Sequence, residues 1–303
     1  MKVEDSNNVL KSHIESVVSD VLDRSFSSIQ INLVPGGSRD GTFQIVVDRI
    51  PMLFCKVNVG DKCPGILQKE SIGLNYLARQ GKIRTPQVIS YKIIGPFEFL
   101  LTEWINCGVS SKAFWEYFGT QLAAIHQLAW VDDLGRNCFG FEEDNYLGRM
   151  FQSNRPCFDW HEFFISRRIE PQLKIARNNG FLGQWAANRF DKLFNRLSEI
   201  FDESRSSLLH GDLWNGNYMC SAEKTPVLID PAVYFGHRSM DIAMTTLFGG
   251  FDSVFYDAYS NSWPFPENYR EQWDICNLYP LLVHLNLFGK SYLESILRTI
   301  RRF

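Results

Sequence analysis

The stretch Leu209-His210-Gly211-Asp212-Leu213-Trp214-Asn215-Gly216-Asn217 decides the fold class of this chain. Its glycines and asparagines predict a loop, which presents the carboxylate of Asp212 and, five residues later, the amide of Asn217. Thirteen residues after Asn217, Asp230 follows the apolar run Pro226-Val227-Leu228-Ile229, which predicts a short strand. Carboxylate and amide oxygens are ligands that suit Mg²⁺, and a carboxylate can also accept a proton.

The order His, Asp and Asn with these spacings is typical of the catalytic loop of kinase-like enzymes, and Asp230 falls where their second metal-binding acid stands. We predict that Asp212 orients the attacking hydroxyl and accepts its proton, while Asn217 and Asp230 hold Mg²⁺. The alternative is an Asp-Gly and Asn-Gly turn that merely connects strands.

An upstream pair of charged residues supports this interpretation. Strand alternation in Leu53-Phe54-Cys55-Lys56-Val57 puts Lys56 on the face opposite Cys55 and Val57. A lysine in the middle of an apolar strand is costly unless it meets an anion. Glu70 lies in the following predicted helix, so we expect a Lys56–Glu70 pair that binds ATP phosphates; a surface lysine and a solvated glutamate are the alternative.

Two further segments complete a predicted nucleotide site. Gly36 and Gly37 lie between two predicted strands ahead of Lys56, where backbone N–H groups could cradle phosphate, although the segment matches neither G-x-G-x-x-G nor a Walker loop. The run Leu100 to Ile105 precedes the change from strands to helices. There we expect the Glu103 carbonyl and the Ile105 N–H to meet adenine.

The pattern of the chain predicts two lobes. Residues 1–105 read as a helix over about 9–22, strands at 29–33, 43–47 and 52–59, a helix over 66–80, and strands at 88–94 and 97–104. Residues 106–303 are mostly helical, with 209–217 as the catalytic loop and Asp230 as the metal acid. We therefore predict an α+β, two-lobed protein-kinase-like fold with a β-rich N-lobe, one key helix and a mostly helical C-lobe.

Composition excludes several classes of protein. A net charge of −3 over 303 residues argues against nucleic acid as a partner. The polar N-terminus has no signal-peptide core and no apolar run could span a membrane, so we expect a cytoplasmic protein, as a monomer or weak homo-oligomer. The 7 cysteines lack C-x-x-C spacing and read as reduced thiols. The 14% aromatic content fits either a generous core or an aromatic-walled pocket.

Together these segments resemble the aminoglycoside-phosphotransferase-like kinases and, within them, the fructosamine kinase (ketosamine-3-kinase) family. The resemblance spans roughly residue 29 to the C-terminus, and the tract from Pro226 to Arg238, continuing to Phe251, is the most diagnostic part. Other similar segments are Phe54–Asn58, Asp144–Gly148, Asp159-Trp160 and His284–Gly289. The loop at Gly36 departs from the family pattern, since Arg39 and Asp40 stand where smaller or apolar residues are usual.

The resemblance implies an ATP- and Mg²⁺-dependent enzyme that phosphorylates the 3-hydroxyl of a fructosamine or ribulosamine. The phosphorylated adduct is unstable and releases its amine, so the reaction is a deglycation. It also implies supporting roles for His210, Asp241 and His237 around the catalytic loop. Trp214, beside the base, is expected to face the sugar, with lobe packing as its alternative.

Other functions fit parts of the pattern. A kinase of another amino-alcohol or of an aminoglycoside-like substrate would use the same residues. A nucleotide-binding pseudokinase is disfavoured because each acid and amide that catalysis needs is present. A metal hydrolase that uses His210, Asp212, Asp230 and His237 leaves Lys56 and Glu70 unexplained.

Overall fold

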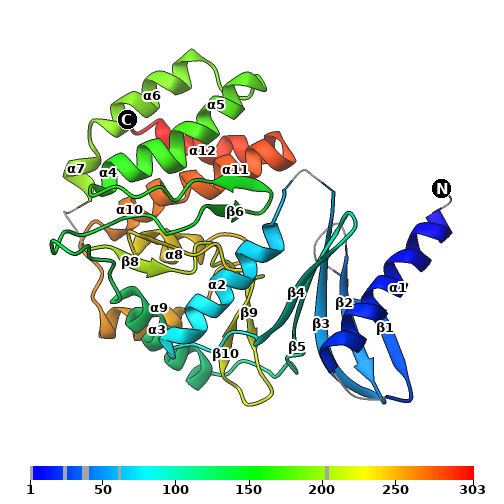
Figure 1. Cartoon of the computed structure of the whole chain (residues 1–303). Coiled ribbons are helices and arrows are strands. Elements are labelled where there is room, and N and C mark those ends of the chain that lie inside the picture. Colours follow the sequence, from blue (N-terminus) through cyan, green and yellow to red (C-terminus); the bar gives the residue numbers. More distant parts are fainter. Residues whose placement is uncertain (1–2, 23–25, 36–40, 61–62, 202–204) are drawn as a thin grey trace.

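A computed structural model describes residues 3–22, 26–35, 41–60, 63–201 and 205–303, with residues 3–8 as backbone only. The N-terminal part holds a five-stranded antiparallel sheet in the order β1-β2-β3-β5-β4, with a helix against each of its faces (Figure 1). Its elements are α1 (Val3–Leu22), β1 (Ile29–Leu33), β2 (Thr42–Val47), β3 (Ile50–Val59), α2 (Ile66–Gln80), β4 (Val88–Ile94) and β5 (Phe97–Glu103). The predicted strand at 52–59 begins earlier, at Ile50, because the turn is confined to Asp48 and Arg49, both at positive φ.

Alternation along the strands sorts side chains between the two helices. Cys55, Val57 and Phe99 are fully buried and belong to the apolar cluster that includes Val17 and Val18 of α1. Leu100, on the other face, packs with Leu67 and Leu74 of α2. Lys56 is paired in register with Leu100, so its side chain shares the face that α2 covers.

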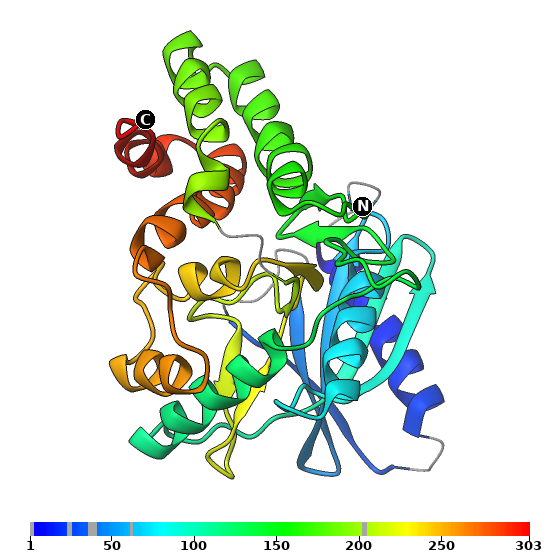
Figure 2. The same cartoon turned by 90° about the vertical axis from the view of Figure 1, so that its left-hand side faces the viewer.

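The remainder of the chain is mostly helical, with three short two-stranded ladders (Figures 1 and 2). The helices are α3 (Lys112–His126), α4 (Trp160–Phe163), α5 (Glu170–Asn178), α6 (Gln184–Phe194), α7 (Leu197–Ile200), α8 (Ser239–Met244), α9 (Ser253–Ser262), α10 (Tyr269–Cys276), α11 (Leu278–Phe288) and α12 (Leu293–Ile300). A π-helical turn (Phe164–Ile169) joins α4 to α5, and a 3₁₀ turn (Lys290–Tyr292) precedes α12. The paired strands are β6 (Asn145–Leu147) with β7 (Met150–Gln152), β8 (Ser207–Leu209) with β11 (Tyr234–Gly236), and β9 (Tyr218–Cys220) with β10 (Pro226–Leu228).

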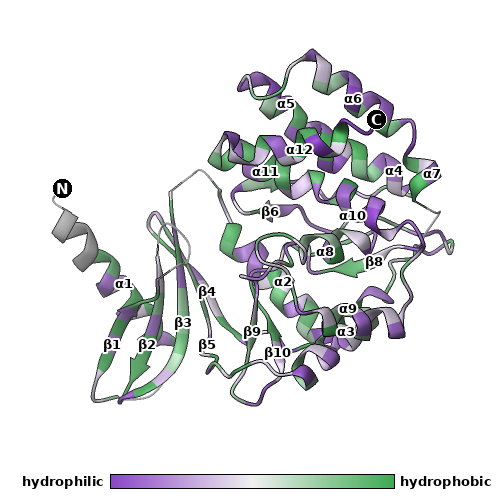
Figure 3. Cartoon of the chain, turned by 180° about the vertical axis from the view of Figure 1, so that it is seen from behind, coloured by the Kyte–Doolittle hydropathy of each residue, from purple (hydrophilic) through white to green (hydrophobic). Residues whose placement is uncertain are grey.

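This arrangement is the predicted α+β architecture. Hydrophobic residues recur along the strands of the sheet and along the helices, where they are mixed with hydrophilic ones (Figure 3). Aromatic side chains fill much of the helical core, for example Phe118, Phe163 and Phe255, each 0% exposed. In the described part of the chain the 7 cysteines form no disulfide bond with one another, and most of them are buried. No helix among the described residues is long and apolar enough to cross a bilayer.

Candidate active site

A cavity of about 310 Å³ lies between the sheet and the helical part. Its lining combines the inner face of β3 and β5 with the segment 216–230 of the helical part. The lining residues are Val34, Pro35, Thr42, Phe54, Lys56, Glu70, Leu74, Pro86, Leu100, Thr102, Glu103, Trp104, Ile105, Cys107, Gly216, Met219, Ile229 and Asp230. Apolar walls therefore surround one cluster of charged side chains.

Lys56, Glu70 and Asp230 form that charged cluster. The Nζ of Lys56 lies 2.8 Å from Glu70 Oε1 and 2.5 Å from Asp230 Oδ1. Burial alone would lower the pKa of Lys56, but the two carboxylates outweigh it and raise that pKa above its ordinary value. The ammonium group thus stays charged in a site with little access to water.

The catalytic-loop candidates lie beside this cluster, in the segment that joins β8 to β9. The Nδ2 of Asn217 donates hydrogen bonds to the backbone oxygen of Asp212 at 2.8 Å and to its Oδ2 at 2.9 Å. This geometry orients the Asp212 carboxylate and turns the Asn217 Oδ1 away from it. Burial, followed by repulsion from Asp230, raises the pKa of Asp212 to about 7.

Asp230, two residues after the end of β10, has an unusual backbone conformation. Its φ of 56° lies in the left-handed region, which Asp tolerates better than most residues. The N–H of the preceding Ile229 donates to the Asn217 backbone oxygen at 3.1 Å. The segments that carry Asn217 and Asp230 are therefore tied to each other.

A buried layer underneath holds the loop backbone. Asp241, 1% exposed at the start of α8, accepts hydrogen bonds from the N–H groups of His210 (2.7 Å) and Gly211 (2.9 Å). His210 Nε2 donates to the Ile229 carbonyl, so its Nδ1 accepts the Asp212 N–H and the ring is neutral. Burial lowers the pKa of His210, which agrees with this assignment.

His237 and Trp214 contact different sets of residues. His237 is 3% exposed, accepts the N–H of Ser239 and packs against Trp160 and Phe201. Trp214 is half-buried, covers Gly216 and meets the ring of Phe248 edge-on at 5.7 Å. Phe248, 38% exposed, in turn contacts His284, so an aromatic wall extends from the loop toward α11.

Of the other residues predicted to contact the nucleotide, the structure describes Glu103 and Ile105 but not Gly36 and Gly37. Glu103 and Ile105 both line the cavity, and the Glu103 carboxylate accepts from Arg84 at 2.7 Å and from the Gln87 N–H at 3.0 Å. Gly36 and Gly37, together with Arg39 and Asp40, lie outside the described residues. Val34 and Pro35 just before them line the same cavity.

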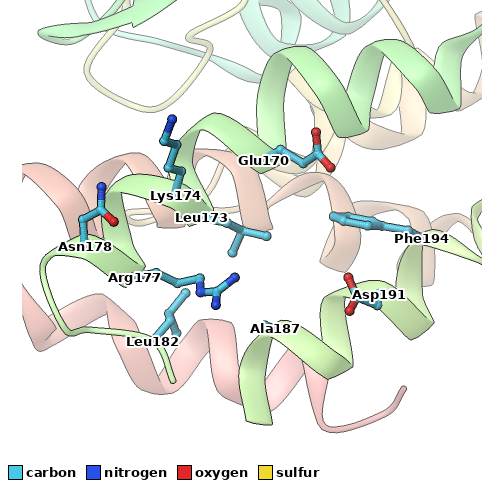
Figure 4. A pocket seen from close by; sticks show the side chains of 9 residues that line it. All are labelled: Glu170, Leu173, Lys174, Arg177, Asn178, Leu182, Ala187, Asp191 and Phe194. Carbon is cyan, nitrogen blue, oxygen red and sulfur yellow. The ribbon is translucent and has the colours of Figure 1, made fainter. Parts of the chain in front are cut away.

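A second cavity, of about 530 Å³, lies between α5 and α6 (Figure 4). It mixes acids and bases, Glu170 and Asp191 with Lys174 and Arg177, around Leu173 and Phe194. Figure 1 places these helices at the end of the helical part opposite β9 and β10. It shares no lining residue with the first cavity and lacks each residue of the catalytic-loop motif.

Comparison with known proteins assigns the family. The family model described as fructosamine kinase matches residues 10–303. The chain belongs to the fructosamine kinase family. A probable ketoamine kinase of Lactiplantibacillus plantarum is 33% identical over 276 residues, which cover 90% of this chain and 94% of that protein.

Solved structures agree with membership in the fructosamine kinase family. The crystal structure of a putative fructosamine-3-kinase from Haemophilus somnus superposes with a TM-score of 0.83 at 26% identity, covering 95% of this chain and 96% of that one. The streptomycin–ATP–APH(2″)-IIa ternary complex shares the fold alone, with a TM-score of 0.63 at 12% identity and 96% coverage of both chains. The predicted protein-kinase-like architecture and the resemblance to this family are thus confirmed.

Sequence reasoning missed two residues that build the site of this fructosamine kinase family member, His126 and Met219. His126, at the end of α3, is fully buried and lies 3.2 Å from Asp241 Oδ2 and 2.9 Å from the Tyr259 hydroxyl. Its position at the last turn of an apolar helix carried no signal beyond core packing. Met219, which lines the cavity from β9, could have been found, because it stands two residues after Asn217 on the strand that leaves the loop.

Proposed function

We propose that this protein is an ATP-dependent small-molecule kinase that phosphorylates the 3-hydroxyl of a ketosamine, either a fructosamine or a ribulosamine. In this proposal residues 1–105 form the nucleotide-binding lobe and residues 106–303 supply the catalytic loop. The observation that carries it is the contact of Lys56 with both Glu70 and Asp230 in one cavity, beside Asp212 and Asn217. Membership in a family of ketosamine kinases supports the substrate class.

The cavity is suited to a nucleotide. Adenine would lie between the apolar side chains of β3 and β5 and bond to the Glu103 carbonyl and the Ile105 N–H, while the phosphates reach Lys56. Gly36 and Gly37 would cover the phosphates from the β1–β2 connection. A structure of the same fold holds ATP, which supports this placement.

The residues beside the cavity also fit Mg²⁺. Asp230 offers a carboxylate with a side chain 42% exposed, and Asn217 presents its amide oxygen on the side away from Asp212. Both are hard oxygen donors, which Mg²⁺ prefers. When bound, the ion would neutralise phosphate charge, and Lys56 would then exchange its bond to Asp230 for one to phosphate.

Asp212 would handle the proton in the chemical step. The substrate hydroxyl oxygen forms a bond to the γ-phosphorus, the bond from that phosphorus to the β–γ bridging oxygen breaks, and ADP leaves. The hydroxyl proton passes to Asp212 Oδ1, the oxygen to which Asn217 does not donate. A carboxylate whose pKa is raised to about 7 by burial and by Asp230 is matched to accept a proton near neutrality.

The aromatic wall of Trp214, Phe248 and His284 supports a sugar substrate. Aromatic faces suit the C–H surfaces of a sugar, and this wall begins two residues from Asp212. A phosphorylated ketosamine is unstable and releases its amine. The proposed reaction is therefore a deglycation.

The test is ATP consumption with Mg²⁺ and either fructosyl-lysine or ribulosyl-lysine. We expect the wild type to turn over at least one of the two adducts. Asp212→Asn should lower that turnover by about 10²–10⁴-fold. Asp257→Asn, which changes an exposed acid on α9, should keep full activity. Turnover of choline-like amino-alcohols or aminoglycosides, with neither adduct consumed, would replace the substrate assignment. ATP binding without turnover of any substrate would indicate a pseudokinase.

A further inference from the structure

The β6–β7 hairpin lies beside the first turns of α2, the helix that carries Glu70 (Figure 1). Its strands, Asn145–Leu147 and Met150–Gln152, are joined by Gly148 and Arg149, with Gly148 at a φ of 57°. The hairpin includes most of the Asp144–Gly148 segment, to which the catalytic assignments give no role. The hairpin contacts the segment after Asp230 at its base, and β3 and the start of α2 at its tip.

The base of the hairpin is bonded to the residues that follow Asp230. Asn145 Nδ2 donates to the Val233 carbonyl at 2.9 Å, and Gln152 Nε2 donates to Asn145 Oδ1 at 2.7 Å. Gln152 is 1% exposed, and its Oε1 accepts the Tyr279 hydroxyl at 2.9 Å. Buried side-chain bonds of this kind fix geometry, because each unmade bond would leave a polar group without water.

The tip of the hairpin is bonded to the sheet and to the start of α2. Arg149 Nη2 donates to Asn58 Oδ1 on β3 at 3.0 Å, two residues after Lys56. The Arg149 carbonyl accepts the Cys63 thiol at 3.6 Å, and the Tyr146 hydroxyl donates to the Pro64 carbonyl at 3.2 Å. Both partners precede the first residue of α2.

A carboxylate continues the connection from Asn58 into α2. Asn58 Nδ2 donates to Glu98 Oε1 at 3.2 Å, and Glu98 accepts the N–H groups of Gly65 at 2.8 Å and Leu67 at 3.3 Å. Glu98 is 8% exposed and so acts as a buried anion at the N-terminus of the helix, where the helix dipole favours it. Arg149, Asn58 and Glu98 therefore connect the hairpin tip to the first turn of α2.

Helix α2 and the hairpin meet again on the segment after Asp230. A Cβ placed on Gly73 would lie 3.2 Å from the side chains of both Pro231 and Val233, so α2 packs closely against this segment. Glu70, one turn before Gly73, reaches Lys56 from the same side. The hairpin thus bridges the same two structural units, β3 with α2 and the segment after Asp230, whose side chains meet in the Lys56–Glu70–Asp230 cluster.

We propose that the β6–β7 hairpin is a positioning element of the nucleotide site, and that Arg149 is its positioning residue. By fixing the start of α2 and the backbone of β3 relative to residues 231–233, it holds Lys56 and Glu70 at bonding distance from Asp230. The effect on catalysis rests on the proposed kinase function. The effect on α2 does not.

The test compares Arg149→Met with Arg155→Met, an exposed arginine just beyond the hairpin. We expect Arg149→Met to raise the Kd for MgATP by about tenfold, because it removes the charged donor that holds Asn58. The KM for the sugar-amine stays within about twofold, and amide hydrogen exchange quickens in residues 65–70. Arg149→Lys, which keeps a donor, recovers part of the affinity, and Arg155→Met matches the wild type in each measurement.

Unchanged MgATP affinity in Arg149→Met overturns the proposal, as does faster exchange spread over the whole chain with both KM values raised alike. If Arg149→Met does not fold, Tyr146→Phe serves instead, since it removes only the hydroxyl bond to Pro64. For Tyr146→Phe we also expect weaker MgATP binding and faster exchange in residues 65–70. If neither the affinity nor the exchange rate changes, the proposal is refuted. If the wild type consumes no ATP with any sugar-amine, the proposed function fails, while MgATP binding and exchange at 65–70 still decide whether the hairpin positions α2.

Discussion

Lys56 bonds to Asp230 across the cavity, with Nζ and Oδ1 2.5 Å apart. Lys56 comes from the middle strand of the sheet, and Asp230, 174 positions later in the chain, follows the end of β10. In the proposed kinase, phosphate oxygens of ATP would replace the Asp230 oxygen on the Lys56 ammonium group. The two carboxylates keep that ammonium group charged, so the cation is already present. In the proposed kinase this contact would hold the Lys56 cation ready for the phosphates of ATP.

Replacing Lys56 is expected to impair nucleotide use far more than a comparable surface change. Lys56→Met keeps the length of the side chain but removes the cation, so kcat/KM for ATP should fall by about 10²-fold or more. Steady-state kinetics with varied ATP measures this. Lys92→Met is the matched control, since Lys92 on β4, at the edge of the same sheet, forms an exposed pair with Asp20. Equal kinetics in the two variants would contradict the role of Lys56.

Gly211 is expected to be irreplaceable in the catalytic loop. Its φ is 83°, and an added Cβ would lie 2.0 Å from the Ala232 carbonyl oxygen, so Gly211→Ala should cost about 4 kcal/mol or more in the free energy of unfolding. Gly135→Ala separates clash from conformation, because Gly135 has a similar φ of 78° with nothing within 4 Å, and should cost only about 1–2 kcal/mol. Urea unfolding measures both. Similar losses would show that backbone conformation, and not the contact with Ala232, makes the glycine necessary.

The sequence was informative where a pattern is local or strongly periodic. Helix α2 has the predicted bounds, 66–80, because its apolar spacing is regular and Gly81 ends it in the left-handed conformation. The Lys56–Glu70 contact also followed from a sequence pattern, since a strand lysine among apolar residues needs a partner. Both inferences depend on residues close together in the chain.

Long-range and very short elements could not be predicted in the same way. Strands β8 and β11 have only three residues each, too few to show alternation, and they pair with each other from distant parts of the chain. A π-helical turn at Phe164–Ile169 joins α4 to α5, and apolar spacing does not reveal such a turn. Glu98 reads as an ordinary strand glutamate until the fold brings the N-terminus of α2 onto it.

Trp214 is expected to affect the sugar and not the nucleotide. Its ring lies over Gly216 and against Phe248, outside the lining of the nucleotide cavity. Trp214→Ala should raise the KM for fructosyl-lysine by about tenfold, the value of an aromatic contact, while the KM for ATP stays within about twofold. Trp185→Ala, at an exposed tryptophan of α6, is the control and should change neither. A rise in both KM values would indicate that Trp214 packs the loop and does not meet substrate.

Acid is expected to destabilise the protein through the histidine beneath the catalytic loop. Burial lowers the pKa of His126 despite the nearby Asp241 carboxylate, so the folded protein holds this ring neutral with Nε2–H toward Asp241. In the unfolded chain a histidine takes up a proton below a pH of about 6.5. The unfolded state then binds more protons, and the free energy of unfolding falls as the pH drops from 7 to 5.

His126→Gln should reduce that fall by about 1 kcal/mol per pH unit between pH 6.5 and 5.5. Asp212 acts in the opposite direction, because burial raises its pKa to about 7 and the folded protein takes up the proton first. The comparison of the variant with the wild type removes this contribution, since Asp212 is present in both. Urea unfolding followed by tryptophan fluorescence at pH 7.5, 6.5 and 5.5 provides the measurement. Parallel pH dependences in the two proteins would mean that His126 becomes protonated inside the fold as readily as outside it, and that Asp241 outweighs burial there.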